Sequence, residues 1–242
     1  MTILRDEARI ARLRRLGAYA SLIGFLALVF ALVAGFLDER FFYLQIVLLP
    51  VGWLISQIGL YMSHRYMREP RPDEVLDEAL GRVARNGRMY HYLLPASHVL
   101  LMPAGPIVFV TKYQGGDISV EGDRWKQKGV SLFRKLLSQE ALGNPTREAE
   151  QAVRSLASYI SKHAPEVEEV PIGAIIVFTS KTGADLDLEG STIPAMHYTK
   201  LRGYFKRKAP REPLPEEDYR ALRAAFDKAA ARVIEQEKVT VA

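Results

Sequence analysis

PASHVLLMPAGPIVFVTKYQGGDISVEGDRWKQ, residues 95–127, contains two short apolar runs joined by turn residues. The runs 97–102 and 107–110 are too short for helices and are bounded by proline and glycine residues that break regular structure, so we predict two buried strands. Residues 103–106, Pro-Ala-Gly-Pro, form the turn between them. The second strand ends at Lys112. A lysine at the end of a buried strand is suited to bind a phosphate group, so Lys112 is the first candidate site residue.

Strands and helices alternate through the polar part of the chain. Periodicity and turn signals predict strands at 89–94, 117–120, 124–127, 171–179 and 193–197, and helices at 73–84, 130–142, 145–163, from 199, and at 216–237. The run 171–179 is the most apolar and should be a central strand. The segment 181–191 is predicted as a polar loop. This alternation is typical of an α/β sheet flanked by helices.

Two apolar runs near the start of the chain predict a transmembrane hairpin. Residues 17–36 carry no charge over about 20 positions, enough to span a bilayer core of roughly 30 Å. Residues 41–62 form a second run, whose Gln45, Gln57 and Pro50 are tolerated in membrane helices. Very few polar residues separate the runs, so the helices should be antiparallel neighbours. A cleavable signal peptide is disfavoured by the length of the first run and by the second run after it.

Small residues recur on one face of the second run, at Gly52, Ser56 and Gly59. They can permit close helix contact, or they can be ordinary small residues of a membrane helix.

Arginines predict the orientation of the hairpin. They precede the first run and follow the second: Arg5, Arg9, Arg12, Arg14, Arg15, Arg65, Arg68 and Arg71. The positive-inside rule then places both termini in the cytoplasm, with the helices in the inner (plasma) membrane. The expected organisation is a basic cytoplasmic N-terminus (1–16), the hairpin (17–62, helices about 17–36 and 41–62), a linker (63–72), a cytoplasmic domain (73–208) and a C-terminal amphipathic helix (209–242).

Composition excludes several kinds of site. The chain of 242 residues has a net charge of +5 and no cysteine, which excludes a disulfide scaffold, a thiolate metal site and a cysteine nucleophile. No phosphate-binding loop motif and no nucleophile-elbow serine occurs in the sequence.

The order of short motifs provides a further clue. A strand opens at Ser97-His98, a turn follows at Pro103–Gly105, and the next strand ends with Phe109–Lys112. After this strand come Gly116, Ile118 and Trp125. A helix then opens at Asn144-Pro145, and two later strands are predicted at Val170–Thr179 and Ile193–Ala195. Over roughly residues 73–206 this order resembles the nuclease-related domain (NERD) family of the restriction-endonuclease-like group. The resemblance implies a mixed-sheet, restriction-endonuclease-like domain with Lys112 in the nuclease position.

Two departures from the family pattern bear on activity. The resemblance implies an aspartate and a glutamate that hold a divalent metal, but Ser97 and Val110 occupy those positions. A hard cation such as Mg²⁺ needs such oxygen ligands. We therefore expect no metal and no cofactor, with Lys112 as a vestigial catalytic residue. Glu148 or Asp117 could supply a carboxylate from an unusual position, which would give a working Mg²⁺-dependent nuclease instead.

Other polar residues are weaker candidates. His98 could be a ligand or base, although a lone strand histidine is more often packed or on the surface. His91, His163 and His197 lack metal-ligand spacing. The acidic residues of the loop 181–191 are more simply explained as solvated.

A basic run follows the last predicted strand. Its charged members are Lys200, Arg202, Lys206, Arg207 and Lys208, with Tyr204 and Phe205 between them, and Lys126, Lys128, Arg134 and Lys135 form a second group. Basic and aromatic residues together suit nucleic-acid phosphates and stacked bases. A surface beside anionic lipid, or an ordinary solvated surface, accounts for them at least as well.

The sequence therefore favours a membrane-anchored, non-catalytic NERD-like domain that binds nucleic acid or a protein partner at the inner membrane face. The alternatives are the Mg²⁺-dependent nuclease and a membrane scaffold or assembly protein. The substrate, the partner and the oligomeric state are not predicted.

Overall fold

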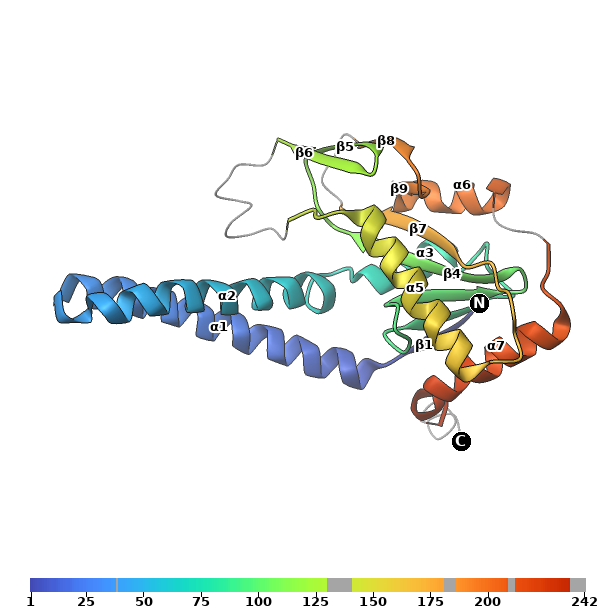
Figure 1. The fold of residues 1–242 in the computed structure, drawn as a ribbon, viewed down its shortest axis with the longest axis horizontal. Helices are drawn as coiled ribbons and strands as arrows, with labels where there is room; N and C mark the ends of the chain where they lie inside the picture. Colours follow the sequence, from blue (N-terminus) through green and yellow to red (C-terminus); the bar gives the residue numbers. More distant parts are fainter. Residues whose placement is uncertain (38, 130–140, 181–185, 209–211, 236–242) are drawn as a thin grey trace. The chain divides into compact units, whose positions relative to one another are not determined.

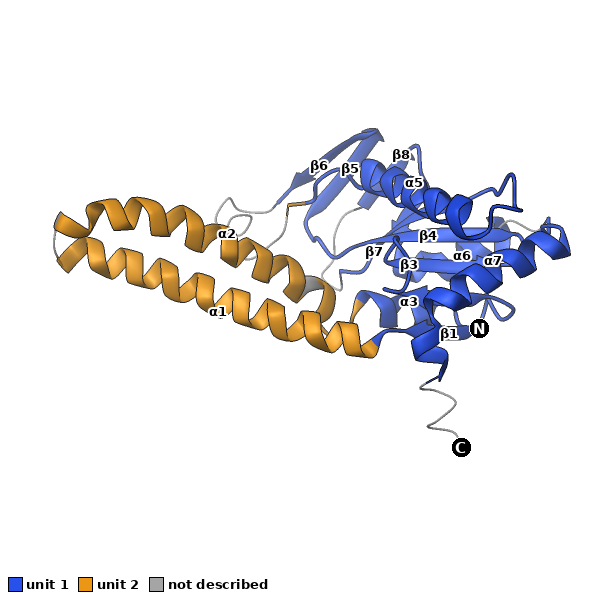
Figure 2. Ribbon diagram, turned by 60° about the horizontal axis from the view of Figure 1, so that its bottom comes forward, with its two compact units in different colours: residues 1–6, 72–130, 142–242 blue, residues 7–71, 131–141 orange. Residues whose placement is uncertain are grey.

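The computed structural model describes residues 1–37, 39–129, 141–180, 186–208 and 212–235 (Figure 1). The chain divides into two compact units, coloured separately in Figure 2. The α/β unit comprises Met1–Asp6, Pro72–Val130 and Leu142–Ala242, and the hairpin unit comprises Glu7–Arg71 and Ser131–Ala141. The α/β unit is therefore discontinuous in sequence, with the helix hairpin inserted after its first six residues.

The hairpin unit contains α1 (Glu7–Leu37) and α2 (Phe42–Tyr66), joined by a 3-10 turn at Glu39–Phe41. Both helices are long and apolar enough to cross a membrane. α1 begins well before the uncharged run because the arginine- and alanine-rich segment that precedes it is also a good helix former. α2 continues through Pro50, as expected for this segment.

Small residues bring α1 and α2 close together. Gly24 and Ala31 are buried, one heptad apart on α1. A Cβ atom on Gly24 would lie 2.9 Å from the carbonyl oxygen of Gly52, and a Cβ atom on Gly59 would lie 2.8 Å from Cα of Ser21. Real Cβ atoms do not approach so closely, so the contact requires glycine at these positions. Of the two interpretations left open for Gly52, Ser56 and Gly59, the structure shows the close helix contact.

A six-stranded mixed sheet forms the centre of the α/β unit. Its order is β1 (Thr2–Arg5), β2 (Arg88–His91), β3 (His98–Met102), β4 (Gly105–Lys112), β7 (Gly173–Phe178) and β9 (Ala195–His197). β2, β3 and β4 form an antiparallel meander, whereas β1 pairs with β2, β7 with β4 and β9 with β7 in parallel. The α/β class is therefore confirmed. β7 is an interior strand, but it lies next to the edge strand β9 rather than in the middle of the sheet.

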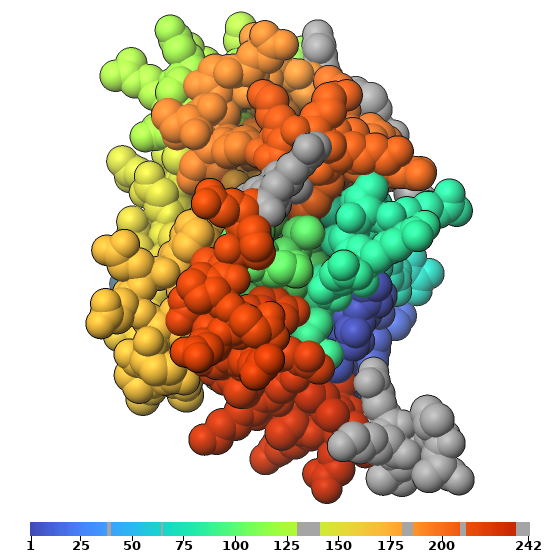
Figure 3. Space-filling view, turned by 90° about the vertical axis from the view of Figure 1, so that its right-hand side faces the viewer, coloured from blue at the N-terminus to red at the C-terminus, as the bar shows by residue number. Residues whose placement is uncertain are grey.

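Helices cover both faces of this sheet: α3 (Pro72–Leu80), α5 (Pro145–His163), α6 (Tyr198–Lys208) and α7 (Glu216–Ala229). Successive side chains of β4 point to opposite faces of the sheet, so they belong to two different hydrophobic cores. Val108 lies in the cluster with Leu156 of α5 and Phe226 of α7. Phe109 lies in the cluster of α3 and α6, with its ring 6.1 Å from that of Phe205. α5 and α7 lie side by side, yellow and red in Figure 3.

A smaller sheet has the order β6 (Arg124–Lys128), β5 (Asp117–Gly122) and β8 (Leu186–Ser191). The predicted hairpin of β5 and β6 is confirmed. The predicted loop at 181–191 is wrong for residues 186–191, which pair in parallel with β5. The reason is that Leu186 and Leu188 alternate with polar residues and pack into the cluster containing Ile118. Residues 181–185 lie outside the described part of the chain.

Two other segments differ from the predictions, and a third is not tested. Thr2–Arg5 form β1, which was not predicted within the basic N-terminus. α3 begins at Pro72 and ends at Leu80, short of the predicted end at residue 84. The predicted helix at 130–142 lies almost entirely outside the described residues.

Candidate functional site

Lys112 is the last residue of β4 and lies on the face of the sheet that α5 covers. It follows Val108 and Val110 at two-residue intervals, so all three side chains point the same way. The lysine is buried, and Nζ donates to the carbonyl oxygen of Leu142 at 3.0 Å and to Oε1 of Glu148 at 2.6 Å. The structure thus brings together the two residues predicted as catalytic candidates.

The start of α5 places Glu148 beside the lysine. Oδ1 of Asn144 accepts a hydrogen bond from the backbone N–H of Arg147 at 3.1 Å, and Pro145 begins the helix, so the predicted cap is confirmed. Glu148 follows in the first turn, where the helix macrodipole favours a carboxylate. Its side chain is 40% exposed and that of Lys112 is 4% exposed. A partly hydrated carboxylate therefore neutralises a buried ammonium group.

The second sheet is fixed to the same helix start. The indole N–H of Trp125 donates to Oγ1 of Thr146 at 2.8 Å, and its ring lies 6.0 Å from that of Phe178. The amide of Gln127 donates to the carbonyl oxygen of Gly115 at 2.7 Å. Trp125 therefore joins β6 to the first turn of α5, the same turn that carries Glu148.

Of the two positions expected to hold metal-binding acids, Val110 lies in β4 and Ser97 directly precedes β3. The antiparallel register of β3 and β4 runs from Val99 opposite Val108 to Met102 opposite Gly105, and it includes neither position. Ser97 is exposed, just before β3, and Val110 packs against the cluster around β7. Among the described residues, no group of three or more histidine, aspartate or glutamate side chains could hold a metal ion. The arrangement as described is an ion pair, without a carboxylate set around Lys112.

Asp117, the other carboxylate considered, lies elsewhere. It is exposed at the start of β5, where its cross-strand neighbour is Lys128. Glu121 similarly lies opposite Arg124. These acids offset the basic residues of β6, which point outward at every second position.

The predicted basic residues of α6 are all exposed: Lys200, Arg202, Lys206, Arg207 and Lys208. The helix contains no acidic residue and buries Leu201 and Phe205 on its inner side. α6 therefore presents a more strongly basic surface than β6, where Lys126 and Lys128 lie beside acids. Arg134 and Lys135 lie outside the described residues.

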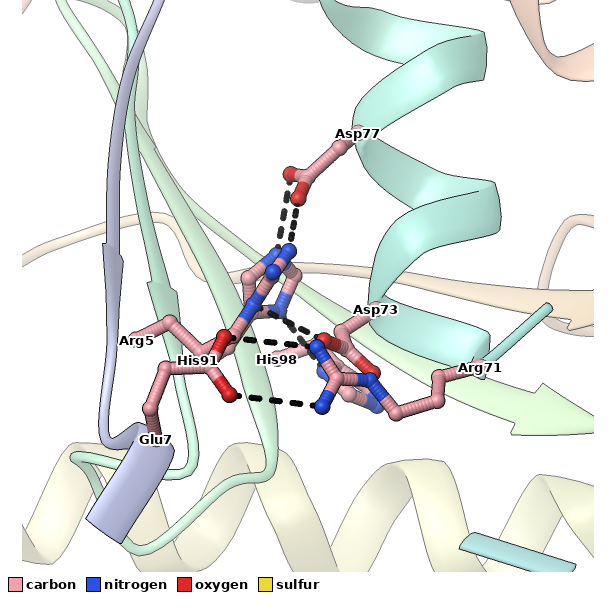
Figure 4. A network of polar contacts seen from close by, with 7 residues as sticks. All are labelled: Arg5, Glu7, Arg71, Asp73, Asp77, His91 and His98. Carbon is pink, nitrogen blue, oxygen red and sulfur yellow. Dashed lines mark hydrogen bonds and ion pairs between the residues drawn. The ribbon is translucent and has the colours of Figure 1, made fainter. Parts of the chain in front are cut away.

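A buried polar cluster was missed by sequence reasoning, and Figure 4 shows it. We call it the histidine cluster, and it consists of Arg5 of β1, Asp73 and Asp77 of α3, His91 of β2 and His98 of β3. The two Nδ1 atoms of the histidines lie 2.9 Å apart, and Nε2 of His91 lies 3.0 Å from Oδ1 of Asp77. Arg5 pairs with both carboxylates. The missed signal was the hairpin register around Pro95, which sets His91 opposite His98.

A second polar network joins β2 to α7. The Tyr90 hydroxyl donates to Oδ1 of Asp227 at 2.8 Å and accepts from Nε of Arg88 at 3.1 Å. Nη2 of Arg88 also pairs with Oδ1 of Asp227 at 2.8 Å. Burial, together with the hydrogen bond to Asp227, raises the pKa of Tyr90 well above its ordinary value. The neutral hydroxyl is therefore the stable form in this network.

The chain matches no family model, and comparison with curated proteins and with solved structures finds no significant match.

Proposed function

We propose that this protein is a membrane-anchored docking protein whose α/β unit has a degenerate, NERD-like nuclease frame and binds a partner without cleaving it. The observation that supports the proposal most is the closed Lys112–Glu148 pair, with Ser97 and Val110 at the positions of the expected acids. A lysine already neutralised by a carboxylate is poorly suited to orient an attacking water. Without metal-binding acids, little would stabilise the charge on a phosphate.

The membrane part of the proposal rests on the two apolar helices and on β1. Both helices are long and apolar enough to cross a bilayer. Because β1 pairs with β2, the N-terminus and the rest of the α/β unit must share one side of a membrane. That arrangement requires an even number of spans, which agrees with a hairpin. The flanking arginines favour the cytoplasmic side.

The surface of α6 suggests the chemistry of the partner. Its exposed basic residues lie on a helix without acids, and Tyr204 is half-buried among them. Such a surface suits a phosphate backbone, whose binding weakens steeply with salt. We therefore propose nucleic acid as the partner, with an acidic protein surface or anionic lipid as the competing outcomes.

The test uses the full chain in nanodiscs of neutral lipid, so that lipid charge does not compete. Binding to single- and double-stranded DNA and RNA is measured over a salt series, and cleavage is measured with Mg²⁺ and Mn²⁺. We expect salt-dependent binding without cleavage. Replacing Lys206, Arg207 and Lys208 by glutamine should lower the slope of log K against log salt by about 3. Replacing Arg154, Arg220 and Arg223, exposed on α5 and α7, is the matched control and should leave the slope unchanged.

Two other experimental outcomes would favour the alternative functions. Cleavage that disappears in Lys112→Ala would establish the Mg²⁺-dependent nuclease, with Glu148 as its displaced carboxylate. No binding to any nucleic acid would favour a scaffold or assembly protein.

A separate experiment tests whether the α/β unit has the strand arrangement of a nuclease domain. Ser97→Asp combined with Val110→Glu should create divalent-metal binding, measured by calorimetry, if the two positions face each other as the family resemblance implies. The single substitutions are the controls, and equal binding by a single variant would argue against the shared site.

A further inference from the structure

The histidine cluster forms a row across three strands. Arg5 lies opposite His91 in the parallel register of β1 and β2, and His91 lies opposite His98 in the antiparallel register of β2 and β3. Both histidines are buried, with exposed fractions of 0% and 2%. Asp73 and Asp77 face this row from α3, and the ring of Tyr92 meets that of His98 edge-on at 4.9 Å. Three cationic or protonatable groups therefore face two carboxylates.

The contact between the histidines sets a limit on protonation. Two Nδ1 atoms 2.9 Å apart must share one proton, because one nitrogen donates and the other accepts. A neutral pair satisfies this geometry, and so does a pair carrying one extra proton. A second extra proton would place an N–H on both nitrogens, and the two cations would repel each other at hydrogen-bonding distance.

Charge counting within the cluster agrees with this limit. Arg5 and the two aspartates give a net charge of −1 when both histidines are neutral. One extra proton on the histidine pair makes the buried cluster neutral. A second would leave it at +1, and burial of uncompensated charge is costly.

The cluster lies at both covalent connections to the helix hairpin. β1 ends at Arg5, and α1 begins at Glu7, whereas α3 begins at Pro72, directly after the hairpin unit ends. Figure 4 also shows Glu7 and Arg71, which pair with each other at 3.3 Å within the hairpin unit. The cluster therefore links the strand that leads into the hairpin, β1, to the helix that follows it, α3.

We propose that the histidine cluster is an acid-sensitive latch for β1, which holds the strand in the sheet while the His91–His98 pair carries at most one extra proton. When β1 undocks, Arg5 leaves the cluster, so water reaches the two rings and Asp73 and Asp77 are free to balance two imidazolium charges. The rings can then move apart, and both can be protonated near the ordinary histidine pKa of about 6.5. Below that pH the undocked state binds one proton more than the docked state. Acid therefore releases β1, and the latch is closed above about pH 6.5.

Hydrogen exchange of the full chain in nanodiscs tests the latch. After correction for intrinsic rates, protection of the β1 amides should fall about tenfold per pH unit below roughly pH 6.5, as expected for uptake of one proton. His98→Gln keeps hydrogen-bonding groups but cannot be charged, so its protection should change less than about twofold between pH 7.5 and 5. His163→Gln, at an exposed position on α5, is the matched control and should retain the full response.

Asp77→Asn provides a second test of the latch, which does not depend on whether β1 docks in His98→Gln. Without that carboxylate the docked cluster no longer stabilises the first extra proton, so protection should fall more steeply, by up to about a hundredfold per pH unit. Wild-type protection that does not change between pH 7.5 and 5 would overturn the latch, as would an unaltered slope in Asp77→Asn. Loss of protection on adding a chelator would also overturn it, because a metal would then join the histidines.

Discussion

Replacing Glu148 by glutamine should destabilise the α/β unit more than replacing Lys112 by methionine. The first change leaves a buried ammonium group whose remaining described partner is the carbonyl oxygen of Leu142. Breaking a fully buried ion pair from one side costs about 3–5 kcal/mol. The side chain of Glu148 is 40% exposed, so water already screens the pair, and we expect a loss of about 2 kcal/mol in the free energy of unfolding.

Lys112→Met removes the charge that needs compensation. Methionine fills a similar volume, and Glu148 can remain hydrated at its exposed edge. The carbonyl oxygen of Leu142 loses one donor, so the expected cost is about 1 kcal/mol or less. The double variant should be about as stable as Lys112→Met alone, because glutamate has no charge to neutralise once the lysine is gone.

Tryptophan fluorescence can follow this unfolding selectively. The chain has two tryptophans, Trp53 in α2 and Trp125 in β6, whose indole donates to Thr146 in the first turn of α5. In a Trp53→Phe background, the emission of Trp125 during guanidinium titration of the detergent-solubilised chain reports on the α/β unit. If Lys112→Met proved as destabilising as Glu148→Gln, or more so, the ion pair would not be a buried charge held by its partner, and the reasoning above would be wrong.

Three further predictions concern helix packing, pH and capping. Gly24→Leu should separate α1 from α2 and lower the thermal midpoint in detergent, whereas Ala18→Leu, on an exposed face, should not. Because the pKa of Tyr90 is raised, the stability that its neutral hydroxyl contributes is complete below about pH 10 and is lost as pH rises further. Tyr90→Phe should therefore flatten the alkaline limb of a stability–pH profile, and an unchanged limb would contradict this assignment. Asn144→Ala should cost about 1 kcal/mol in denaturant unfolding, with Asn86→Ala at an exposed turn as the control.

Local signals explain what the sequence predicted well. The apolar runs, the Asn144-Pro145 helix start and the turn between β5 and β6 each depend on neighbours a few residues away. Lys112 and Glu148 were each recognisable as candidates by position on their own element. Their contact was not predictable, because it depends on how α5 crosses the end of β4.

Non-local pairing explains what the sequence did not reveal. β1 has only four residues, and its partner β2 lies beyond the entire hairpin, so the arginines around it suggested a tail. β8 has the alternation of a strand, but its polar residues and its neighbouring loop masked it. The histidines are not neighbours in the sequence, and only the register of three strands places them in one row with Arg5.

The insertion of the hairpin between β1 and α3 affects the biosynthesis of this protein. β1 is translated before the hairpin, yet its partner strand β2 emerges only after both apolar helices, seconds later at roughly 5–20 residues per second. The sheet cannot close until the whole hairpin and β2 have been synthesised, so both apolar helices leave the ribosome before the α/β unit is complete. A fragment that begins at Pro72 would lack β1 and would leave β2 as an open edge, and such edges invite aggregation. Truncation at the end of the hairpin therefore removes part of the α/β unit together with the two apolar helices.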